Sequence, residues 1–435
     1  MTELKGLIPY TAAYIISFLM AGAGLHLPSG LLLICAAVFI YVKEYKITHR
    51  RLNLRGLFAL GLTGGEGVSC FQLSRLQHDW TVVTWICFYL GFAVFYAVCG
   101  FVMNERKMPA AAETEYRDIS VQAAELKYLK LSIAILLVIS YAAFAFEVWK
   151  LRYIPCLVTD TPHAYSFFHV KGVHYFTTAA VLIPSLAMLY LQRKKKPDIT
   201  VLLGLILPLI LTILLVSRFQ FLFAVILAVF IAAESGRRYK PWQAVLIAVF
   251  MTAVYIMITV ARAHSVQYLN GIFEMRNPSM PIFITQPYIY IANNYDNFNI
   301  MTEKLVRHSM GLKLLYPFVT LTGLKFLIPI PSDFPLFVTK TELTTVTVLY
   351  DAYYDFGIAG VALFSGVLGM ISGMVSVWIR ENRNPFSALI YVQLSFYLLF
   401  SFFTTWFSNP ATWFYLGISV ILYLFYEFML RRNQI

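Results

Sequence analysis

Long apolar stretches, separated by short polar segments, recur along the whole chain. Most approach the roughly 20 residues that a helix needs to cross the hydrocarbon core of a bilayer. The pattern therefore predicts an all-α fold, a polytopic bundle of about twelve spans that forms a single integral membrane domain over residues 1–435. The expected spans are 7–24, 28–42, 56–74, 80–102, 130–148, 175–191, 199–216, 219–234, 243–262, 357–379, 386–404 and 411–430.

The basic residues indicate the orientation of these spans. Most of the 34 Lys and Arg lie in short segments that would share one side of the membrane with both ends of the chain. Short loops rich in Lys and Arg stay cytoplasmic, so both termini and the linker 103–130 are predicted to be cytoplasmic. The net charge of +12 is then largely a topology signal, and no nucleic-acid partner is predicted.

Two longer loops would lie on the outer side, at 149–174 and 263–356. Within the second, the run 311–331 is apolar enough to resemble a further span, but it contains Lys313, Pro317 and Lys325. We predict an interfacial or re-entrant element there. The large outer loop, with its interfacial helices, is where chemistry is expected.

Two arginines at predicted span ends on the outer side are candidate anion ligands. Arg218 lies in a 33-residue stretch otherwise free of charge, where the chain must turn back, and Arg262 ends the ninth span. Guanidinium groups bind phosphate in a bidentate manner, so the pair could hold a pyrophosphate. The alternative is ordinary anchoring of each arginine to the membrane interface.

Polar and aromatic residues in the outer loops are candidate sugar ligands. In the stretch 287–305, apolar residues follow helical spacing and amides and one acid occupy another face, which predicts an amphipathic interfacial helix. Amides and carboxylates pair with hydroxyls, and aromatic rings can pack on sugar rings. A purely structural interfacial helix is the alternative. The candidates here are Tyr288, Asn293, Asn294, Tyr295, Asp296 and Asn297, together with His174 at the entry of a span.

Asp351 and Asp355 lie four residues apart at the edge of the tenth predicted span, beside Tyr350 and Tyr354. On a helix the two acids share one face, and a partly buried carboxylate could act as general base on a sugar hydroxyl. His264 is a third candidate base, and both tyrosines are candidate sugar ligands. The alternative is a pair of acids that complement a helix N-terminus.

The sequence predicts no metal site and no cofactor. The histidines of the first outer loop lack the spacing of metal ligands, and no D-x-D motif occurs anywhere in the chain. A glycosyl donor would then be an activated lipid whose pyrophosphate is neutralised by arginine.

Four stretches carry a family resemblance: VSRFQFLFA (216–224), FFHVKGVHYF (167–176), PYIYIANNYDNFN (287–299) and YYDFGIAG (353–360). With the number of spans, they make the chain resemble bacterial oligosaccharide repeat-unit polymerases of the Wzy type and, more distantly, the O-antigen ligases. The resemblance implies a GT-C-like fold in the bacterial inner membrane. It also implies a metal-independent transfer of glycan from polyprenyl pyrophosphate to an incoming lipid-linked repeat on the periplasmic face.

The resemblance assigns the pyrophosphate to Arg218 and Arg262, and leaves the base open among Asp351, Asp355 and His264. It implies membrane lipids and the lipid-linked oligosaccharide as partners, and allows a chain-length regulator and a flippase. Two alternatives stay open: a ligase, and a flippase or transporter for lipid-linked oligosaccharides. The second is favoured by Glu66, an acid inside the glycine-rich third span.

Overall fold

The computed structural model describes residues 2–105, 119–158, 164–194, 198–234, 266–327, 331 and 334–433. Helices form nearly all the regular structure in these ranges, which contain no strand and one isolated antiparallel bridge between Ser74 and Met275. Six helical segments of this part are long and apolar enough to cross a membrane: His26–Thr48, Val82–Asn104, Gln122–Leu151, Val173–Arg193, Tyr350–Glu381 and Pro410–Arg432. The protein is therefore a helical membrane protein, as predicted.

Each predicted span within the described residues contains helix, but several of the helices are short. The third predicted span is divided among three consecutive helical pieces over Leu54–Ser69. The predicted span at 386–404 contains a helix of only 13 residues. The predicted span 243–262 lies outside the described residues.

Contacts divide the chain into two compact units, where the sequence predicted one domain. The first unit comprises residues 1–111, 266–381 and 394–413. Its helical elements are α1 (Thr2–Gly22), α2 (His26–Thr48), α3 (Leu54–Phe58), the π-helix η1 (Ala59–Thr63), α4 (Gly64–Ser69), α5 (Val82–Glu105), α13 (Val266–Phe273), α14 (Ile282–Lys304), α15 (Leu312–Leu321), η4 (Leu324–Phe326), α16 (Tyr350–Glu381), the end of α17 (Ser387–Leu399) and η5 (Trp406–Ser408).

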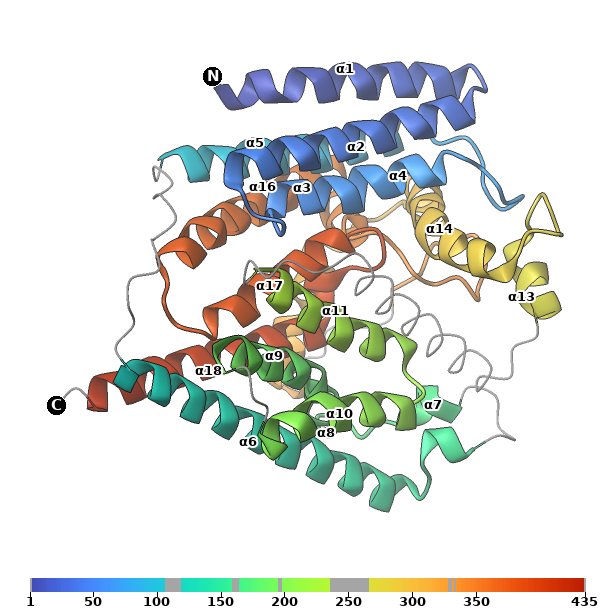
Figure 1. Ribbon diagram of the computed structural model, residues 1–435. Coiled ribbons are helices and arrows are strands. Elements are labelled where there is room, and N and C mark those ends of the chain that lie inside the picture. The colour runs from blue at the N-terminus through green and yellow to red at the C-terminus, as the bar shows by residue number, and fades with distance from the viewer. Residues whose placement is uncertain are drawn as a thin grey trace. The chain divides into compact units, whose positions relative to one another are not determined.

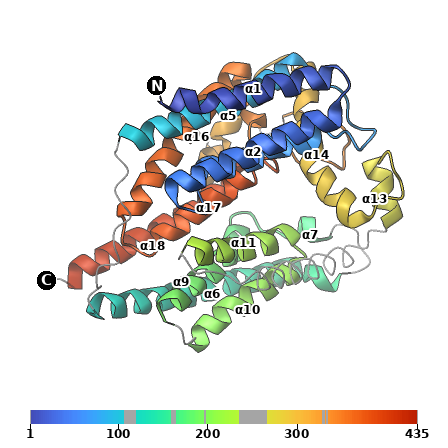
Figure 2. The same cartoon turned by 45° about the horizontal axis from the view of Figure 1, so that its top comes forward.

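In the first unit, α1 and α2 lie side by side, and α3, η1 and α4 follow one another along α2 (Figure 1). The Ser17 and Ser29 hydroxyls, 2.7 Å apart, join α1 to α2. Helices α5 and α16 also pack against each other (Figure 2). Gly369 makes this close approach possible, because a Cβ atom there would lie 2.6 Å from the carbonyl oxygen of Phe95.

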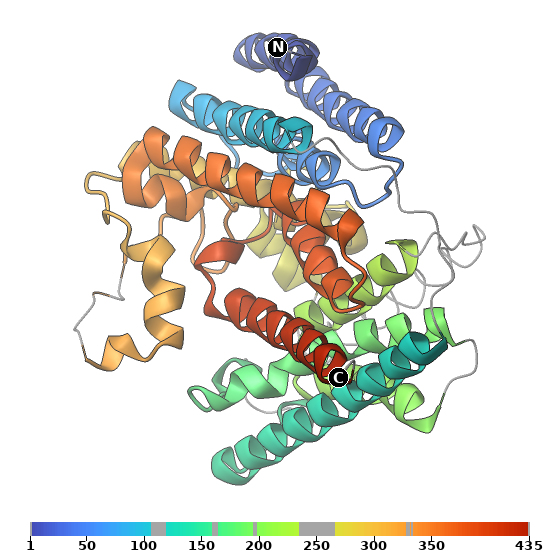
Figure 3. The ribbon, with the colours of Figure 1, turned by 90° about the vertical axis from the view of Figure 1, so that its left-hand side faces the viewer.

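The second unit comprises residues 112–265, 382–393 and 414–435. Its elements are α6 (Ile119–Leu151), η2 (Pro155–Leu157), α7 (Ala164–Phe167), α8 (Val173–Thr178), η3 (Ala179–Leu182), α9 (Ile183–Arg193), α10 (Ile199–Leu214), α11 (Arg218–Glu234), the start of α17 and most of α18 (Pro410–Asn433). The long helix α6 meets α18 near Tyr128, whose ring contacts those of Phe425 and Tyr426 (Figure 3).

Within the run 311–331, the residues that the structure describes form a short helix and not a span. Helix α15 has ten residues and, at 1.5 Å per residue, is about 15 Å long, half of what a bilayer core requires. Leu315, Phe318 and Leu321 on this helix are exposed. An exposed apolar face on a short helix fits the predicted interfacial element.

Candidate functional site

The acidic and aromatic stretch at the edge of the tenth predicted span forms the first turns of α16. The helix is interrupted directly after it, at Phe356 and Gly357. Gly357 has φ 61° and ψ −145°, a conformation that is essentially restricted to glycine, and a Cβ atom there would lie 3.3 Å from Cε1 of His308. The break separates residues 350–355 from the apolar part of the helix, close to the predicted span boundary at residue 357.

Asp355 anchors α15 to α16. Its buried carboxylate accepts hydrogen bonds from the backbone amides of Leu314, at 2.9 Å, and Lys313, at 3.1 Å, and from the hydroxyl of Ser309. The two amides belong to the first turn of α15, where a carboxylate satisfies free donors and complements the helix dipole. Asp355, a candidate base from the sequence, is therefore held by three protein donors in a structural role.

Asp351 has a different environment on the same face of α16. Its Oδ1 lies 3.0 Å from Nζ of Lys313, and the two side chains are 9% and 16% exposed. The ammonium of Lys313 also lies 4.5 Å from the centre of the Tyr354 ring and 5.7 Å from that of Tyr350, within the range of cation–π attraction. Of the two acids, Asp351 is thus the one beside a cation and aromatic rings.

Tyr350 and Tyr354, beside these acids, are buried and make most of their contacts within the protein. The Tyr350 hydroxyl accepts from the amide of Phe337, at 2.9 Å, and donates to its carbonyl, at 3.2 Å. Tyr354 is 3% exposed and covers Lys313. Its carbonyl lies 3.2 Å from Nδ1 of His308, a neighbour of the site that the sequence analysis did not identify.

The predicted helix at 287–305 is present as α14, but its polar face is buried and bonded to the chain's own backbone. The Asn297 amide donates to the carbonyls of Leu343 and Thr345, at 2.8 Å each, and its oxygen accepts from the amide of Thr339. Asn293 and Asn294 are likewise bonded within the first unit. The expected interfacial, sugar-facing surface is therefore replaced by a structural one.

Asp296 and the tyrosines of α14 hold two other segments in place. Oδ1 of Asp296 accepts from Nε1 of Trp80 at 2.9 Å, and Oδ2 accepts from Nε2 of Gln77 at 3.0 Å. Burial raises the pKa of Asp296 to about 7, although the two hydrogen bonds lower it.

The tyrosines of α14 also bond to other segments. The Tyr288 hydroxyl donates to Oε1 of Gln77, and the Tyr295 hydroxyl donates to the carbonyl of Leu62. Helix α14 thus organises the core of the first unit.

His174 is paired with a buried acid that the sequence analysis missed. Its Nδ1 lies 3.1 Å from Oε1 of Glu147, which also accepts from the amide of Val170 at 2.9 Å. The hydroxyl of Thr177 donates to the other oxygen of Glu147 at 2.7 Å. The signal was available in FAFEVW (144–149), where a single acid stands among apolar residues. His174 therefore has a structural partner in the second unit.

The turn that was predicted to carry Arg218 is present. Helix α10 ends at Leu214, Val216 adopts a left-handed conformation with φ 54°, and α11 begins at Arg218. Arg218 is partly buried and belongs to the second unit, whereas Asp351 belongs to the first. Arg262 and His264 lie outside the described residues.

Comparison of the chain with protein-family models, with curated proteins and with solved structures finds no match in any of the three.

Proposed function

We propose that this protein is a glycosyltransferase that polymerises lipid-linked oligosaccharide repeat units on the outer face of the bacterial inner membrane. The observation that carries the proposal is the ion pair between Asp351, where α16 begins, and Lys313 on the short apolar helix α15. A carboxylate, a cation and aromatic rings beside an interfacial helix suit a substrate with a polar head and a lipid tail. The sequence resemblance to repeat-unit polymerases supports the same activity.

The proposed topology has about twelve spans with both termini cytoplasmic. Because the basic segments stay inside, this topology places the start of α16 and the turn at Arg218 on the outer side. The exposed side chains of Leu315, Phe318 and Leu321 would then contact lipid at the outer surface. A polyprenyl chain in the same leaflet could bring its pyrophosphate to the level of these residues.

In the proposed reaction, an acceptor hydroxyl of the incoming repeat attacks the anomeric carbon of the growing glycan. Asp351 takes the proton of that hydroxyl, and Lys313 orients the carboxylate through its contact with Oδ1. A glycosidic C–O bond forms while the C–O bond to the pyrophosphate breaks, and the bonding electron pair leaves with the pyrophosphate. Arg218 and Arg262 would stabilise the charge of this leaving group.

Two alternative functions are a ligase and a transporter or flippase. A ligase would use the same donor chemistry with an acceptor that is not carried on the polyprenyl lipid. A transporter or flippase is favoured by one specific observation, the fully buried acid Glu66 in the first unit. The polar groups around Asp351 lie at a helix start, which favours the polymerase.

The test uses purified protein in liposomes with a lipid-linked single repeat unit as the sole substrate and a chelator present. We expect a ladder of longer lipid-linked glycans, because the two arginines, and not a metal ion, would neutralise the pyrophosphate. A substrate that stays at one repeat unit would overturn the polymerase. Longer products that form only without the chelator would overturn the metal-independent mechanism.

A further inference from the structure

Glu66 is the acid that the proposed reaction does not use, and its surroundings define a proton position. It lies in α4, directly after the π-helix η1, and is fully buried. Its Oε1 lies 2.5 Å from the hydroxyl oxygen of Tyr14. The same hydroxyl lies 2.8 Å from the carbonyl oxygen of Trp85. The Tyr14 hydroxyl thus contacts two oxygen atoms, Oε1 of Glu66 and the carbonyl oxygen of Trp85.

The number of hydrogen atoms available for these two contacts determines whether the Glu66 carboxyl is protonated. The carbonyl of Trp85 has no hydrogen, so its contact uses the single hydrogen of the Tyr14 hydroxyl. An ionised Glu66 would then leave two oxygen atoms 2.5 Å apart without a hydrogen between them. From this geometry we infer that Glu66 is a proton-binding site: its carboxyl group is neutral and donates from Oε1 to Tyr14, which donates to Trp85.

The groups around the carboxyl agree with a neutral acid. Within the described residues, Oε2 of Glu66 has no hydrogen-bond partner. A buried oxygen without a partner is far less costly when it is uncharged than when it carries a charge. Among the described residues, the titratable groups that interact with Glu66 are Tyr10 and Tyr14 from α1, Tyr295 from α14 and Cys70, directly after α4. None of these is a cation.

Glu44 shows the contrasting arrangement in the same unit. It is also buried, but its Oε2 lies 3.2 Å from NH1 of Arg55 and its Oε1 accepts from the Tyr96 hydroxyl at 2.8 Å. A buried carboxylate beside a guanidinium is stable in the charged form. Glu44 is therefore a matched control, since it shares the burial of Glu66 and differs in its partner.

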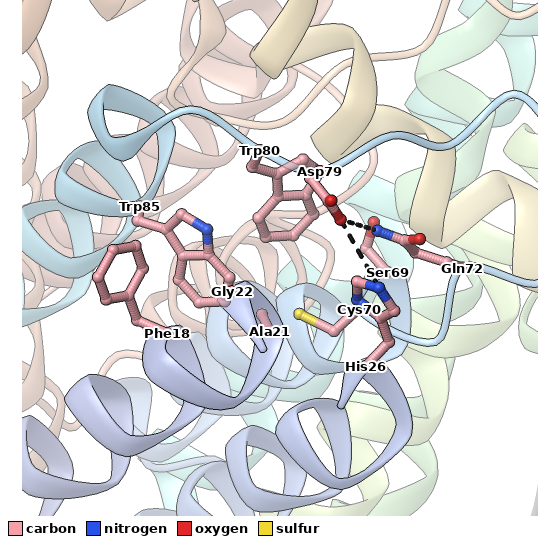
Figure 4. A pocket seen from close by; sticks show the side chains of 10 residues that line it. All are labelled: Phe18, Ala21, Gly22, His26, Ser69, Cys70, Gln72, Asp79, Trp80 and Trp85. Carbon is pink, nitrogen blue, oxygen red and sulfur yellow. Dashed lines mark hydrogen bonds and ion pairs between the residues drawn. The ribbon is translucent and has the colours of Figure 1, made fainter. Parts of the chain in front are cut away.

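A pocket lies beside this region at the end of α1, although Glu66 and Tyr14 do not line it. Phe18, Gly22 and His26 lie on one side of it, and Cys70 and Trp85 lie among its other lining residues (Figure 4). Cys70 is one helical turn beyond Glu66, because its amide donates to the Glu66 carbonyl at 3.0 Å. Trp85 supplies the carbonyl that accepts from Tyr14. Because Cys70 bonds to Glu66 and Trp85 bonds to Tyr14, this pocket would be the path by which the proton exchanges with solvent.

The test is infrared spectroscopy of the purified full-length protein at neutral pH. The spectrum of the wild type minus that of Glu66→Gln is expected to contain the carbonyl-stretch band of a protonated carboxylic acid, and the wild type minus Glu44→Gln is expected to lack it. Asp296, whose pKa is about 7, contributes to every spectrum and cancels in both differences. Tyr14→Phe is expected to keep the band and shift its frequency, because the carboxyl loses its hydrogen-bond acceptor. If Glu66→Gln does not fold, this shift in Tyr14→Phe tests the inference in its place. Identical bands in the wild type and Glu66→Gln, or an unshifted band in Tyr14→Phe, would overturn the inference.

The route is tested by following the same band after transfer to D₂O. Gly22→Phe adds a ring at the pocket and should slow the isotope shift, whereas Ala23→Phe, at the next exposed position outside the pocket lining, should leave its rate unchanged. Equal rates in the two variants would contradict exchange through the pocket. Both measurements are independent of glycan synthesis, so they stand whether or not the protein is a polymerase.

Discussion

Asp351→Asn is expected to lower the rate of polymer formation by about 10²- to 10⁴-fold, the usual contribution of a general base. The amide keeps the size of the side chain but cannot accept the proton of the acceptor hydroxyl. It also removes the charge that faces Lys313 at 3.0 Å. The measurement is the initial rate with the lipid-linked repeat unit in liposomes, made on protein whose thermal unfolding has been checked.

Asp355→Asn is the matched control, one helical turn away. Its carboxylate holds the amides of Lys313 and Leu314, so its loss should lower the free energy of unfolding by about 1–3 kcal/mol. Once the amount of folded protein is taken into account, the activity should fall far less than in Asp351→Asn. If the two variants lose activity equally while both stay folded, Asp351 is not the base.

Arg218→Ala is expected to lower the polymerisation rate by about 10²- to 10³-fold, because it removes a charge that would stabilise the departing pyrophosphate. Arg218→Lys should lose less, since it keeps the charge without the bidentate geometry. Arg431→Ala, at an exposed position near the end of α18, is the control and should leave the rate unchanged. An Arg218→Ala rate within about threefold of wild type would remove this residue from the mechanism.

The helices could be predicted from the sequence because their signal is local. A run of apolar residues is visible without knowledge of any contact, and every predicted span within the described residues contains helix. The division of the third span was not visible. Its π-helix, Ala59–Thr63, contacts Tyr295, whose hydroxyl donates to the carbonyl of Leu62 across 233 positions of the chain.

The site was predicted less well because its contacts join residues that are distant in the sequence. Spacing alone places Asp351 and Asp355 on one face, but their separate roles depend on α15, which begins 39 positions before Asp351. Periodicity likewise identified the polar face of α14 without showing that Leu343 and Thr345 cover Asn297. A polar helical face has the same pattern whether it meets sugar, solvent or backbone.

The most direct test of the central claim is the length distribution of surface and lipid-linked glycans in a bacterial strain that lacks this protein. We expect glycans with a single repeat unit, and restoration of long chains by the wild-type protein but not by Arg218→Ala. Full-length polymer that accumulates on its lipid carrier, or repeat units retained on the cytoplasmic face, would contradict a polymerase and indicate a ligase or a flippase respectively.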